Sequence, residues 1–440
     1  MKQINMILPS FKEKNLTAYA GLNPIFQYLV YHLNVFELLD RQVTFKKKKR
    51  NFTKQDYFKI LFVFFLIGYE RLKHILLLAQ DQFLLTLLNL THIVMPENIV
   101  RCFLAKFNFK HTHEIGQVNA TLLKKKHKTL FSKLTNGYCI VDCDSTPRDT
   151  HGHQEGTGKH YKNHNGYHPI MAFIYQTKEF LHGYLRPGAT YTGNGIVEFL
   201  KESLARLPYC IETILFRADS GFFNQYALQL LEKRGHFYLV AAKLHKPLLQ
   251  RILAIPDKAY RFFKDEDGNI KQITVFHYQL PSWDNARKFV LVRTVKKISD
   301  QLTFEGLNIE YSYQAYCTNL RLSAEEIVNS YKQRGNSENY IKEIKQDLHL
   351  EKTTFDKFWH NEAFFQIMML TYNCIIWFKA EFISLKEAVH ERIQTFRFKY
   401  LLIPAKLKTS ARRLYLDMPR DFRFKDIPQK VFLQTVRLQT

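Results

Sequence analysis

The chain has few cysteines and few acidic residues for its length, and it lacks a long uninterrupted apolar run. Its six cysteines are scattered over 440 residues without a Cys-x-x-Cys pair. That spacing argues against a disulfide framework or a zinc ribbon and fits reduced thiols in a cytoplasm. The longest apolar run, Ile60 to Ile67, is too short to cross a bilayer, and the first residues lack the apolar core of a signal peptide. We therefore expect a cytoplasmic protein with no membrane partner.

The shortage of acidic residues leaves the chain strongly basic. Lys and Arg number 64 against 40 Asp and Glu, which gives a formal net charge of +24. Such a surplus favours a polyanionic partner, either nucleic acid or an anionic membrane surface. No convincing basic amphipathic helix supports the membrane, so nucleic acid is the preferred interpretation. The unbroken bases from Lys46 to Arg50 fit either a solvated loop or a contact to a DNA backbone.

The hydrophobic pattern predicts an α/β protein in five parts. Residues 1–135 have helical patterns, and residues 136–244 have short strand patterns that then alternate with helices, which indicates a mixed sheet with helices on its faces. Within the second part, strands are predicted at Tyr167–Tyr175 and Phe237–Ala241. Residues 245–320 form a β-rich insertion, with strands predicted at Ile270–Tyr278, Lys288–Val295 and Glu310–Cys317. Residues 321–382 contain a helix followed by a second helix, from His360 to Phe382, that is apolar on nearly every side. Residues 383–440 form a basic C-terminal region.

One set of polar residues has the spacing of a helix face. At about 100° per residue, offsets of 0, 3, 7 and 14 fall within roughly 60° of one another. A capping box, Ser323-x-x-Glu326, predicts that the helix begins just upstream. A face with one carboxylate, two cations and one phenol is suited to holding a metal beside a phosphate. Its members are Tyr331, Arg334, Glu338 and Lys345.

Two further carboxylates, Asp144 and Asp219, each close a short apolar run that is typical of a buried strand. Taken singly, such an Asp is more often a helix cap or a surface residue. Together with Glu338 they would repel one another unless a cation neutralised them, and oxygen ligands suit Mg²⁺ or Mn²⁺. Two such ions can activate water or a DNA 3′-hydroxyl for attack on a phosphodiester. Asp142 shares the strand face of Asp144 and is either a partner or the true ligand.

Five histidines gather in a stretch rich in glycine and asparagine. A structural zinc site is one interpretation, but no paired cysteines and no helical His-x-x-x-His with an adjacent acid support it. We favour a loop that contacts phosphates through Lys159 and Lys162. The histidines are His151, His153, His160, His164 and His168.

Three ordered motifs are similar to those of a known family. They are Asp142-Cys143-Asp144-Ser145-Thr146, then Arg217-Ala218-Asp219-Ser220-Gly221-Phe222, then Tyr331-x-x-Arg334-x-x-x-Glu338 with Lys345 seven residues on. The chain resembles the DDE transposases of bacterial insertion sequences. More narrowly, it resembles the group 1 DDE transposase domain, with a Tyr-Arg-Glu-Lys signature and a β-rich insertion. The resemblance runs from about residue 15 to residue 435.

The resemblance implies an RNase H-like catalytic core that uses Mg²⁺, for which Mn²⁺ can substitute. Asp144, Asp219 and Glu338 would be the catalytic, metal-binding triad, and Tyr331, Arg334 and Lys345 would contact DNA phosphates near the transposon end. The DNA partners would be terminal inverted repeats and target DNA, joined by a homodimer through cut-and-paste excision and insertion. Residues 1–135 would be a DNA-binding region, and the protein would act at the nucleoid in a bacterial cytoplasm.

One position departs from the family pattern. Relatives that pass through a DNA hairpin carry Trp directly after the signature arginine, whereas this chain has Gly335. Trp283, in the insertion, is either a replacement stacking platform for a base or part of the insertion core. Two alternatives to an active transposase stay open: an RNase H-like DNA nuclease without strand transfer, and a DNA-binding derivative that has lost catalysis. The intact triad argues against the second.

Overall fold

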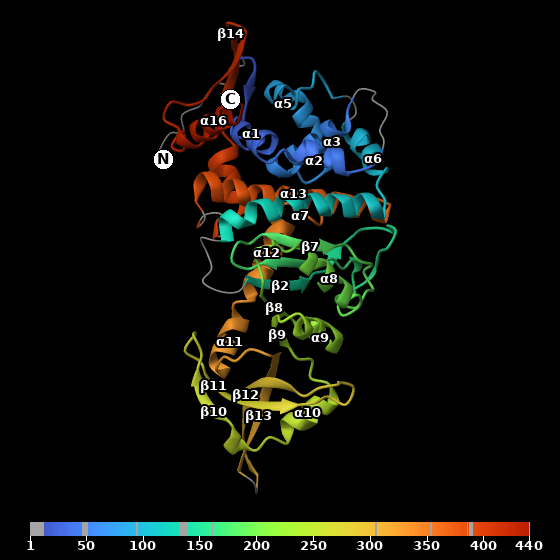
Figure 1. Cartoon of the computed structure of the whole chain (residues 1–440), viewed down its shortest axis with the longest axis vertical. Coiled ribbons are helices and arrows are strands. Elements are labelled where there is room, and N and C mark those ends of the chain that lie inside the picture. Colours follow the sequence, from blue (N-terminus) through green and yellow to red (C-terminus); the bar gives the residue numbers. More distant parts are fainter. Residues whose placement is uncertain are drawn as a thin grey trace, which may run out of the picture.

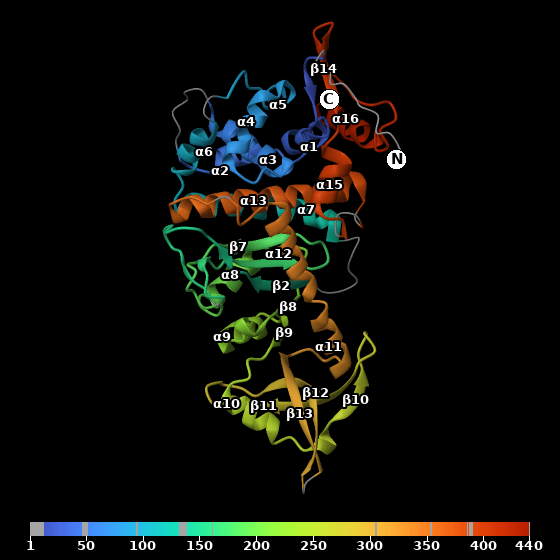
Figure 2. The same cartoon turned by 180° about the vertical axis from the view of Figure 1, so that it is seen from behind.

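The protein is elongated and layered along its long axis (Figures 1 and 2). This computed structural model describes residues 13–45, 52–93, 96–131, 139–160, 162–303, 306–352, 354–384, 386 and 390–439. One end combines the N-terminal helices with the C-terminal segment, the middle holds a sheet covered by long helices, and the other end is β-rich. The basic run from Lys46 to Arg50 lies outside the described residues.

A mixed sheet of nine strands forms the centre, in the order β10-β11-β12-β13-β9-β8-β2-β6-β7. Strands β2, β8 and β9 are parallel, while β6 runs antiparallel to β2 and β7 antiparallel to β6. The carboxyl ends of β2, β7, β8 and β9 therefore meet at one edge of the sheet. The predicted mixed α/β architecture is confirmed. The bounds of these five strands are β2 (Cys139–Ser145), β6 (Ile170–Ile174), β7 (Phe180–Tyr184), β8 (Ile214–Ala218) and β9 (Phe237–Ala241).

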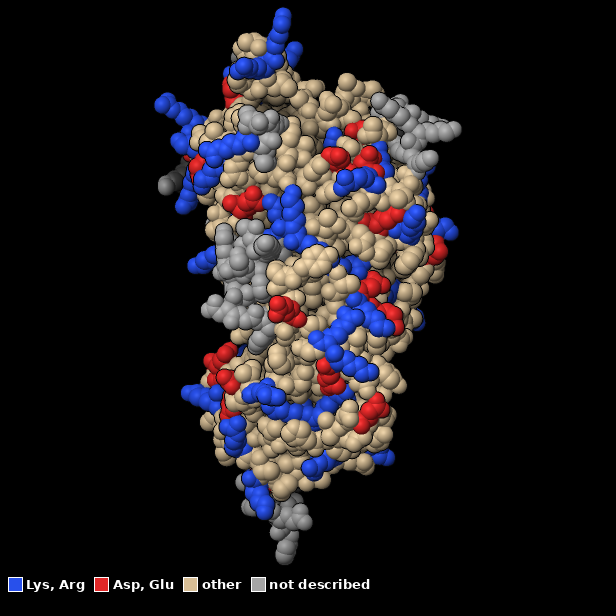
Figure 3. All heavy atoms as spheres, viewed as in Figure 1, with Lys and Arg blue, Asp and Glu red and all other residues tan. Residues whose placement is uncertain are grey.

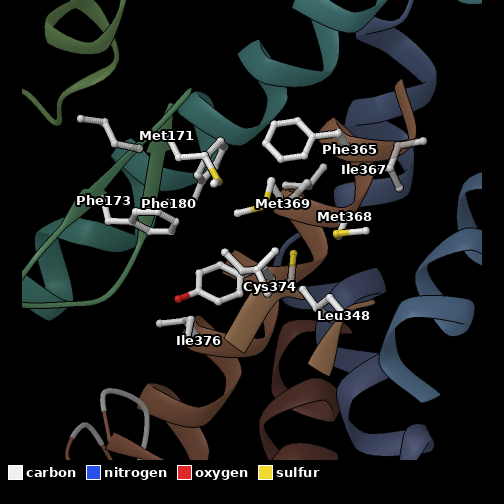
Figure 4. Packing of buried hydrophobic residues seen from close by; sticks show 14 of the residues in the cluster. Met171, Phe173, Phe180, Leu348, Phe365, Ile367, Met368, Met369, Cys374 and Ile376 are labelled. Carbon is white, nitrogen blue, oxygen red and sulfur yellow. The ribbon is translucent and has the colours of Figure 1, made fainter. Parts of the chain in front are cut away.

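Long apolar helices cover the sheet. Helix α13 (Phe358–Phe378), continued by η5 (Lys379–Ile383), packs beside α7 (Phe109–Phe131) and is buried over nearly its whole length. Its Met and Phe side chains interdigitate with those of β6 and β7 (Figure 4). By length and composition this helix could cross a membrane, but 94% of its apolar window is buried inside the protein. The buried helix predicted from His360 is confirmed. Two shorter helices alternate with the strands, α8 (Ile196–Arg206) and α9 (Gln225–Lys233).

The β-rich segment continues the central sheet instead of forming a sheet of its own. Strand β13 pairs antiparallel with β9, with Tyr316 opposite Ala241, so the segment extends the sheet beyond β9. Strand β11 has the bounds predicted for it, and β12 and β13 are longer than predicted. The segment consists of α10 (Lys246–Leu253), η4 (Asp257–Ala259), β10 (Arg261–Lys264), β11 (Ile270–Tyr278), β12 (Arg287–Thr303) and β13 (Gly306–Thr318).

The prediction of a single helix downstream of the capping box is wrong, because two helices form there. The box itself forms, because Ser323 and Glu326 cap each other's backbone, but the helix ends at Lys332. Helix α11 (Ala324–Lys332) is followed by α12 (Gly335–Asp347), and tight turns join them through bonds such as Arg334 N–H to the Tyr331 carbonyl, 2.9 Å. Gly335, Asn336 and Ser337 are weak helix formers, which accounts for the break.

The strand predicted from Tyr167 to Tyr175 is also divided. Strand β5 (Asn165–Tyr167) ends before Pro169, which has no N–H for a sheet ladder, and β6 begins at Ile170. Strand β5 belongs to a separate three-stranded sheet in the order β3-β5-β4, with β3 (Arg148–Asp149) and β4 (Gly158–Lys159). This small sheet directly follows β2.

The two ends of the chain combine into one layer, which the sequence pattern did not indicate. Strand β1 (Leu16–Thr17) pairs with β14 (Ala405–Ser410), which forms a hairpin with β15 (Arg413–Asp417). The hairpin projects from the body, and Figure 3 shows basic side chains at this end. The N-terminal helices are α1 (Leu22–Gln27), η1 (Tyr28–His32), α2 (Val35–Gln42), α3 (Lys54–Ile67), η2 (Leu72–His74), α4 (Ile75–Gln80), α5 (Gln82–Leu88) and α6 (Pro96–Leu104); the C-terminal ones are α15 (Ile393–Phe396), η6 (Arg397–Leu401) and α16 (Asp426–Gln439).

A buried arginine connects this layer to the helix that carries Glu338. Arg397 donates hydrogen bonds to the carbonyls of Phe65 and Leu66 at the end of α3, both 2.8 Å, and to that of Asp347 at the end of α12, 2.6 Å. These carbonyls lie at helix C-termini, where intrahelical partners run out. The guanidinium therefore fixes the C-terminal end of α12 against the N-terminal layer.

Glu362, on α13, provides a test of this packing through the pH dependence of stability. Its buried carboxylate accepts hydrogen bonds from Leu185 N–H, 2.7 Å, and Gln366 Nε2, 2.8 Å, and burial raises its pKa from 4.5 to about 7. A raised pKa stabilises the fold at acidic pH, and that contribution is lost as pH rises through about 7. We expect Glu362→Gln to flatten the stability profile between pH 5 and 8 by about 3 kcal/mol, measured by urea unfolding. The exposed Glu198→Gln is the control, and an unchanged profile in Glu362→Gln would contradict the assignment.

Candidate functional site

Two of the predicted carboxylates lie side by side at the carboxyl edge of the central sheet. Asp144 is the last residue but one of β2, and Asp219 directly follows β8. Because β2 and β8 are parallel and Cys143 pairs with Ala218, the two aspartates occupy matching positions on neighbouring strands. The Asp219 carboxylate accepts a hydrogen bond from Gly221 N–H, 2.9 Å, and so caps the short helix η3 (Ser220–Phe222).

Arg334 brings the third carboxylate to this edge. Its Nη2 atom lies 3.4 Å from Asp144 Oδ2, and its Nη1 atom lies 3.1 Å from Glu338 Oε1. The arginine is buried, whereas the Glu338 side chain is largely exposed. Although its burial disfavours the charge, the carboxylate of Asp144 raises the pKa of the Arg334 guanidinium. The guanidinium thus bridges strand β2 and helix α12.

The surroundings of Asp144 disfavour the charged form of its carboxyl group. Burial raises its pKa to about 7, the nearby charges of Asp219 and Glu338 add to the rise, and Arg334 opposes it. The carboxyl group therefore holds a proton in part of the molecules at neutral pH. A cation placed among the three carboxylates would lower this pKa and displace the proton. A divalent ion would reduce the repulsion among the three carboxylates.

Asp142 is fully engaged elsewhere. Its carboxylate accepts two hydrogen bonds from Arg217, from Nε at 2.7 Å and from Nη2 at 2.8 Å, and both side chains are completely buried. Burial raises the pKa of Asp142, and the two bonds from Arg217 oppose that rise. Arg217 also donates to the Ser330 carbonyl in α11, 2.6 Å. Of the two roles left open for Asp142, the structure favours a partner that holds the site together.

The other residues of the predicted DNA face occupy different places. The ring of Tyr331 is half-buried against Tyr316, with centroids 4.5 Å apart. Lys345 donates to the Pro147 carbonyl, 2.6 Å, and pairs with Glu351, 2.7 Å. The break between α11 and α12 therefore separates Tyr331 from the predicted stripe, whereas Glu338 and Lys345 lie seven residues apart on α12.

The remaining predicted contacts lie farther along the chain. Lys159, in β4, and Lys162, in the turn between β4 and β5, are both exposed. Trp283 is 8% exposed, with its ring 4.7 Å from that of Phe223 and the guanidinium of Arg287 at 4.8 Å from its centroid. This burial is expected of a residue in the core of the β-rich insertion and not of a stacking platform for a base.

The histidine cluster is organised by an aspartate. Asp149 contacts His160 Nε2 at 2.8 Å and His164 Nδ1 at 3.0 Å, while His168 Nδ1 donates to the Thr190 carbonyl, 2.9 Å. Within the parts of the chain that the structure describes, no group of three or more His, Cys, Asp or Glu side chains is arranged to hold a metal ion. This finding covers both the histidines and the three carboxylates, and the Arg334 guanidinium lies between Asp144 and Glu338.

A loop that sequence reasoning missed closes one side of the site. Ser145 Oγ lies 3.2 Å from Thr192 Oγ1, and a Cβ atom on Gly221 would come within 2.6 Å of the Thr192 side chain. The loop between β7 and α8 therefore touches the residue after Asp144 and the segment after Asp219. Its Gly- and Thr-rich composition was the available signal, but composition alone does not show which residues a loop touches.

Comparison with known proteins identifies a related family. A family model described as Transposase DDE domain group 1 matches residues 5–440. A search of curated proteins gives no match. One similar solved structure is the cryo-EM structure of the piggyBac transposase synaptic complex with hairpin DNA; it has 13% sequence identity and a TM-score of 0.48, and the match covers 87% of this chain and 79% of that one.

The buried pair of Asp142 and Arg217 yields a stability prediction that separates a structural role from metal ligation. Asp142→Asn leaves the Arg217 charge uncompensated, so we expect a loss of about 3–5 kcal/mol in the free energy of unfolding by urea. The double change Asp142→Leu with Arg217→Met removes both charges and should recover most of the loss. Unchanged stability of Asp142→Asn would instead point to a ligand.

Proposed function

The chain belongs to the transposase DDE domain group 1 family, and from that membership we propose that it binds the terminal inverted repeats of an insertion sequence and moves the element by metal-dependent cleavage and strand transfer. The match extends over residues 5–440, so it includes the N-terminal layer and the β-rich segment as well as the carboxylates. The observation that carries the proposal is the meeting of Asp144, Asp219 and Glu338 around Arg334 at one sheet edge, within a chain of this family.

We propose Asp144, Asp219 and Glu338 as the residues that hold the metal, with Mg²⁺ as the natural ion and Mn²⁺ as a substitute. Their oxygen atoms are the donors that such hard ions prefer. When bound, the ions would supply an activated water or 3′-hydroxyl and stabilise the leaving oxygen of the phosphodiester. The residues fit this group if Arg334 releases one of the two carboxylates that it bridges, because the guanidinium now neutralises them. The released arginine would then be free to contact a DNA phosphate.

We propose double-stranded DNA as the partner, both at the element ends and at the target. The net charge of +24 and the hairpin arginines Arg412 and Arg413 provide positive potential for phosphate binding. The hairpin lysines Lys406 and Lys408 are paired with Glu13 and Asp417. We further propose an RNase H-like core for residues 136–244 and 321–382, DNA contacts through residues 1–135, a homodimer in the complex of paired ends, and action in the bacterial cytoplasm. Cut-and-paste excision followed by insertion is the proposed pathway.

A change at Asp219 tests the catalytic assignment. We expect Asp219→Asn to abolish cleavage of the DNA that flanks this gene, because the amide cannot supply a charged ligand, while binding to the inverted repeat changes little. Labelled flanking DNA incubated with Mg²⁺ and run on a denaturing gel measures cleavage, and a gel shift measures binding. Glu212→Gln is the matched control, since Glu212 precedes the opposite end of the same strand β8.

The same assay decides among the alternatives. The transposase is supported if wild-type protein alone makes discrete cuts at the repeat and then joins the ends to a target duplex. Diffuse cutting without joined product would identify a nuclease without strand transfer. Specific binding without any cut in Mg²⁺ or Mn²⁺ would identify an inactive DNA-binding derivative. Loss of binding and cleavage together in Asp219→Asn would show that the residue is structural.

The salt dependence of binding tests the DNA face. Lys345→Ala removes one predicted phosphate contact, so we expect weaker binding and a slope of log K against log salt that is less steep by about 0.9. Fluorescence anisotropy across a salt series measures this slope. The control is Lys233→Ala, an exposed lysine at the end of α9 that leads to the opposite edge of the sheet. An unchanged slope in Lys345→Ala would remove this residue from the DNA face.

A further inference from the structure

An exposed tyrosine and a lysine sit together beside the carboxylates. Tyr191 lies on the loop between β7 and α8 and is 53% exposed. Lys243 Nζ donates a hydrogen bond to the Tyr191 hydroxyl, 2.8 Å, and lies 5.0 Å from the centroid of its ring. Lys243 is exposed as well and follows β9 by two residues. Since β9 is parallel to β8, both residues lie at the edge of the sheet that carries Asp144 and Asp219.

The backbone that carries Tyr191 is held firmly on both sides. Buried Arg186 donates to the Thr192 carbonyl, 3.1 Å, and to the Asn194 carbonyl, 3.5 Å. The Thr190 carbonyl receives the hydrogen bond from His168 described above. These contacts surround Tyr191 without using its ring. An exposed aromatic side chain on an immobilised backbone loses little entropy when it binds a flat ligand.

The loop also touches the site directly. Thr192, the next residue, contacts Ser145 and the segment after Asp219, as described above. A Cβ atom on Gly193 would lie 3.3 Å from the Gly221 carbonyl oxygen and 3.5 Å from the Tyr191 ring. The loop that carries Tyr191 therefore packs against the residue after Asp144 and the segment after Asp219. This packing places the Tyr191 ring beside the site in which the proposed function puts the phosphate of a DNA strand.

The two side chains offer complementary contacts to such a strand. An aromatic ring can stack on any of the nucleobases, and a lysine ammonium can bind the phosphate of the same nucleotide. A paired base is already stacked on both faces inside the duplex, so an unpaired base is the one that can use the ring. The pair would thus hold an unpaired nucleotide next to the phosphodiester under attack.

We propose that Tyr191 and Lys243 form a clamp for an unpaired nucleotide of the DNA strand in the carboxylate site, with the ring stacked on its base and the ammonium on its phosphate. This clamp rests on the proposed function, because it needs a DNA strand among Asp144, Asp219 and Glu338. It adds two DNA contacts outside the three motifs of the sequence. The nucleotide belongs either to the element end or to any single strand, and the probes below distinguish these two sources.

The chain contains a matched pair of the same chemistry at the other edge of the sheet. Tyr209 is 89% exposed, and Lys124 Nζ lies 4.5 Å from the centroid of its ring. Tyr209 lies in the segment that leads into the N-terminal end of β8, whereas Asp219 follows the C-terminal end of that strand. Tyr209→Ala and Lys124→Ala therefore control for the loss of an exposed tyrosine or lysine without affecting the proposed clamp.

Binding of tailed DNA to full-length Asp219→Asn protein, which leaves the probe uncut, provides the test. One probe is an element-end duplex with a short single-stranded tail carrying 2-aminopurine, the second has the same tail on an unrelated duplex, and the third is a blunt element-end duplex. We expect the 2-aminopurine fluorescence to be quenched by stacking and restored by Tyr191→Ala. We also expect Tyr191→Ala to weaken binding of the tailed probe by about 10-fold or more, and that of the blunt probe by far less.

Two further variants separate the contribution of the ring from that of the ammonium. Tyr191→Phe keeps the ring and should keep the quenching, which assigns the stacking to the ring and not to the hydroxyl that accepts from Lys243. Lys243→Ala should reduce the salt slope for the tailed probe by about 0.7, the value for one phosphate contact on a single strand. Quenching on both tailed probes would identify any single strand as the ligand, and quenching on the first alone would identify the element end.

Equal behaviour of Tyr191→Ala and Tyr209→Ala on the tailed probes would overturn the clamp. If wild-type protein still cut at the inverted repeat, the proposed function would stand without the clamp. Failure of the intact protein to cut or bind the element end would overturn the proposed function itself. The two failures are therefore distinguishable in one set of measurements.

Discussion

The arrangement of the site depends on one buried ion pair. Asp142 and Arg217 face each other across neighbouring strands, and Arg217 donates two hydrogen bonds to the Asp142 carboxylate in a fully buried position. Arg217 extends the pair to a third element, because it also donates to the Ser330 carbonyl near the end of α11. A buried guanidinium without its carboxylate would be costly, so the three elements are held together as one unit. The turn into α12 is thereby placed where Arg334 reaches Asp144.

Helix α12 is fixed at its other end as well, and this determines the electrostatics of the site. Arg397 binds the Asp347 carbonyl at its C-terminus, and Lys345 donates to the Pro147 carbonyl just after β2. With both ends fixed, the helix presents Glu338 to the aspartates across the Arg334 guanidinium. The site thus contains an internal cation that balances the carboxylates, and under the proposed function a metal ion and a DNA phosphate would replace its partners. Exchange of Arg334 between carboxylate and phosphate would couple metal loading to DNA binding.

Much of this could be predicted from the sequence, because strand-end aspartates and helical spacing leave local patterns. Strands β9 and β11 and the capping box at Ser323 were predicted with their observed bounds, and the carboxylates were identified before their contacts were known. The spacing of the polar residues predicts one continuous helix, but the weak helix propensity of Gly335, Asn336 and Ser337 breaks it. The partner of Asp142, the β1–β14 pairing and the position of Tyr191 result from contacts between distant segments, which leave no periodicity in the sequence.

The proposed function requires that Asp144, Asp219 and Glu338 together bind the divalent ions that act on DNA. An experimental structure of the protein bound to its element-end DNA with Ca²⁺ would test this requirement. We expect oxygen atoms of all three residues within about 2.3–2.6 Å of bound ions and Arg334 turned toward a DNA phosphate. DNA seated elsewhere, or ions held by other residues while Arg334 still bridges Asp144 and Glu338, would contradict it.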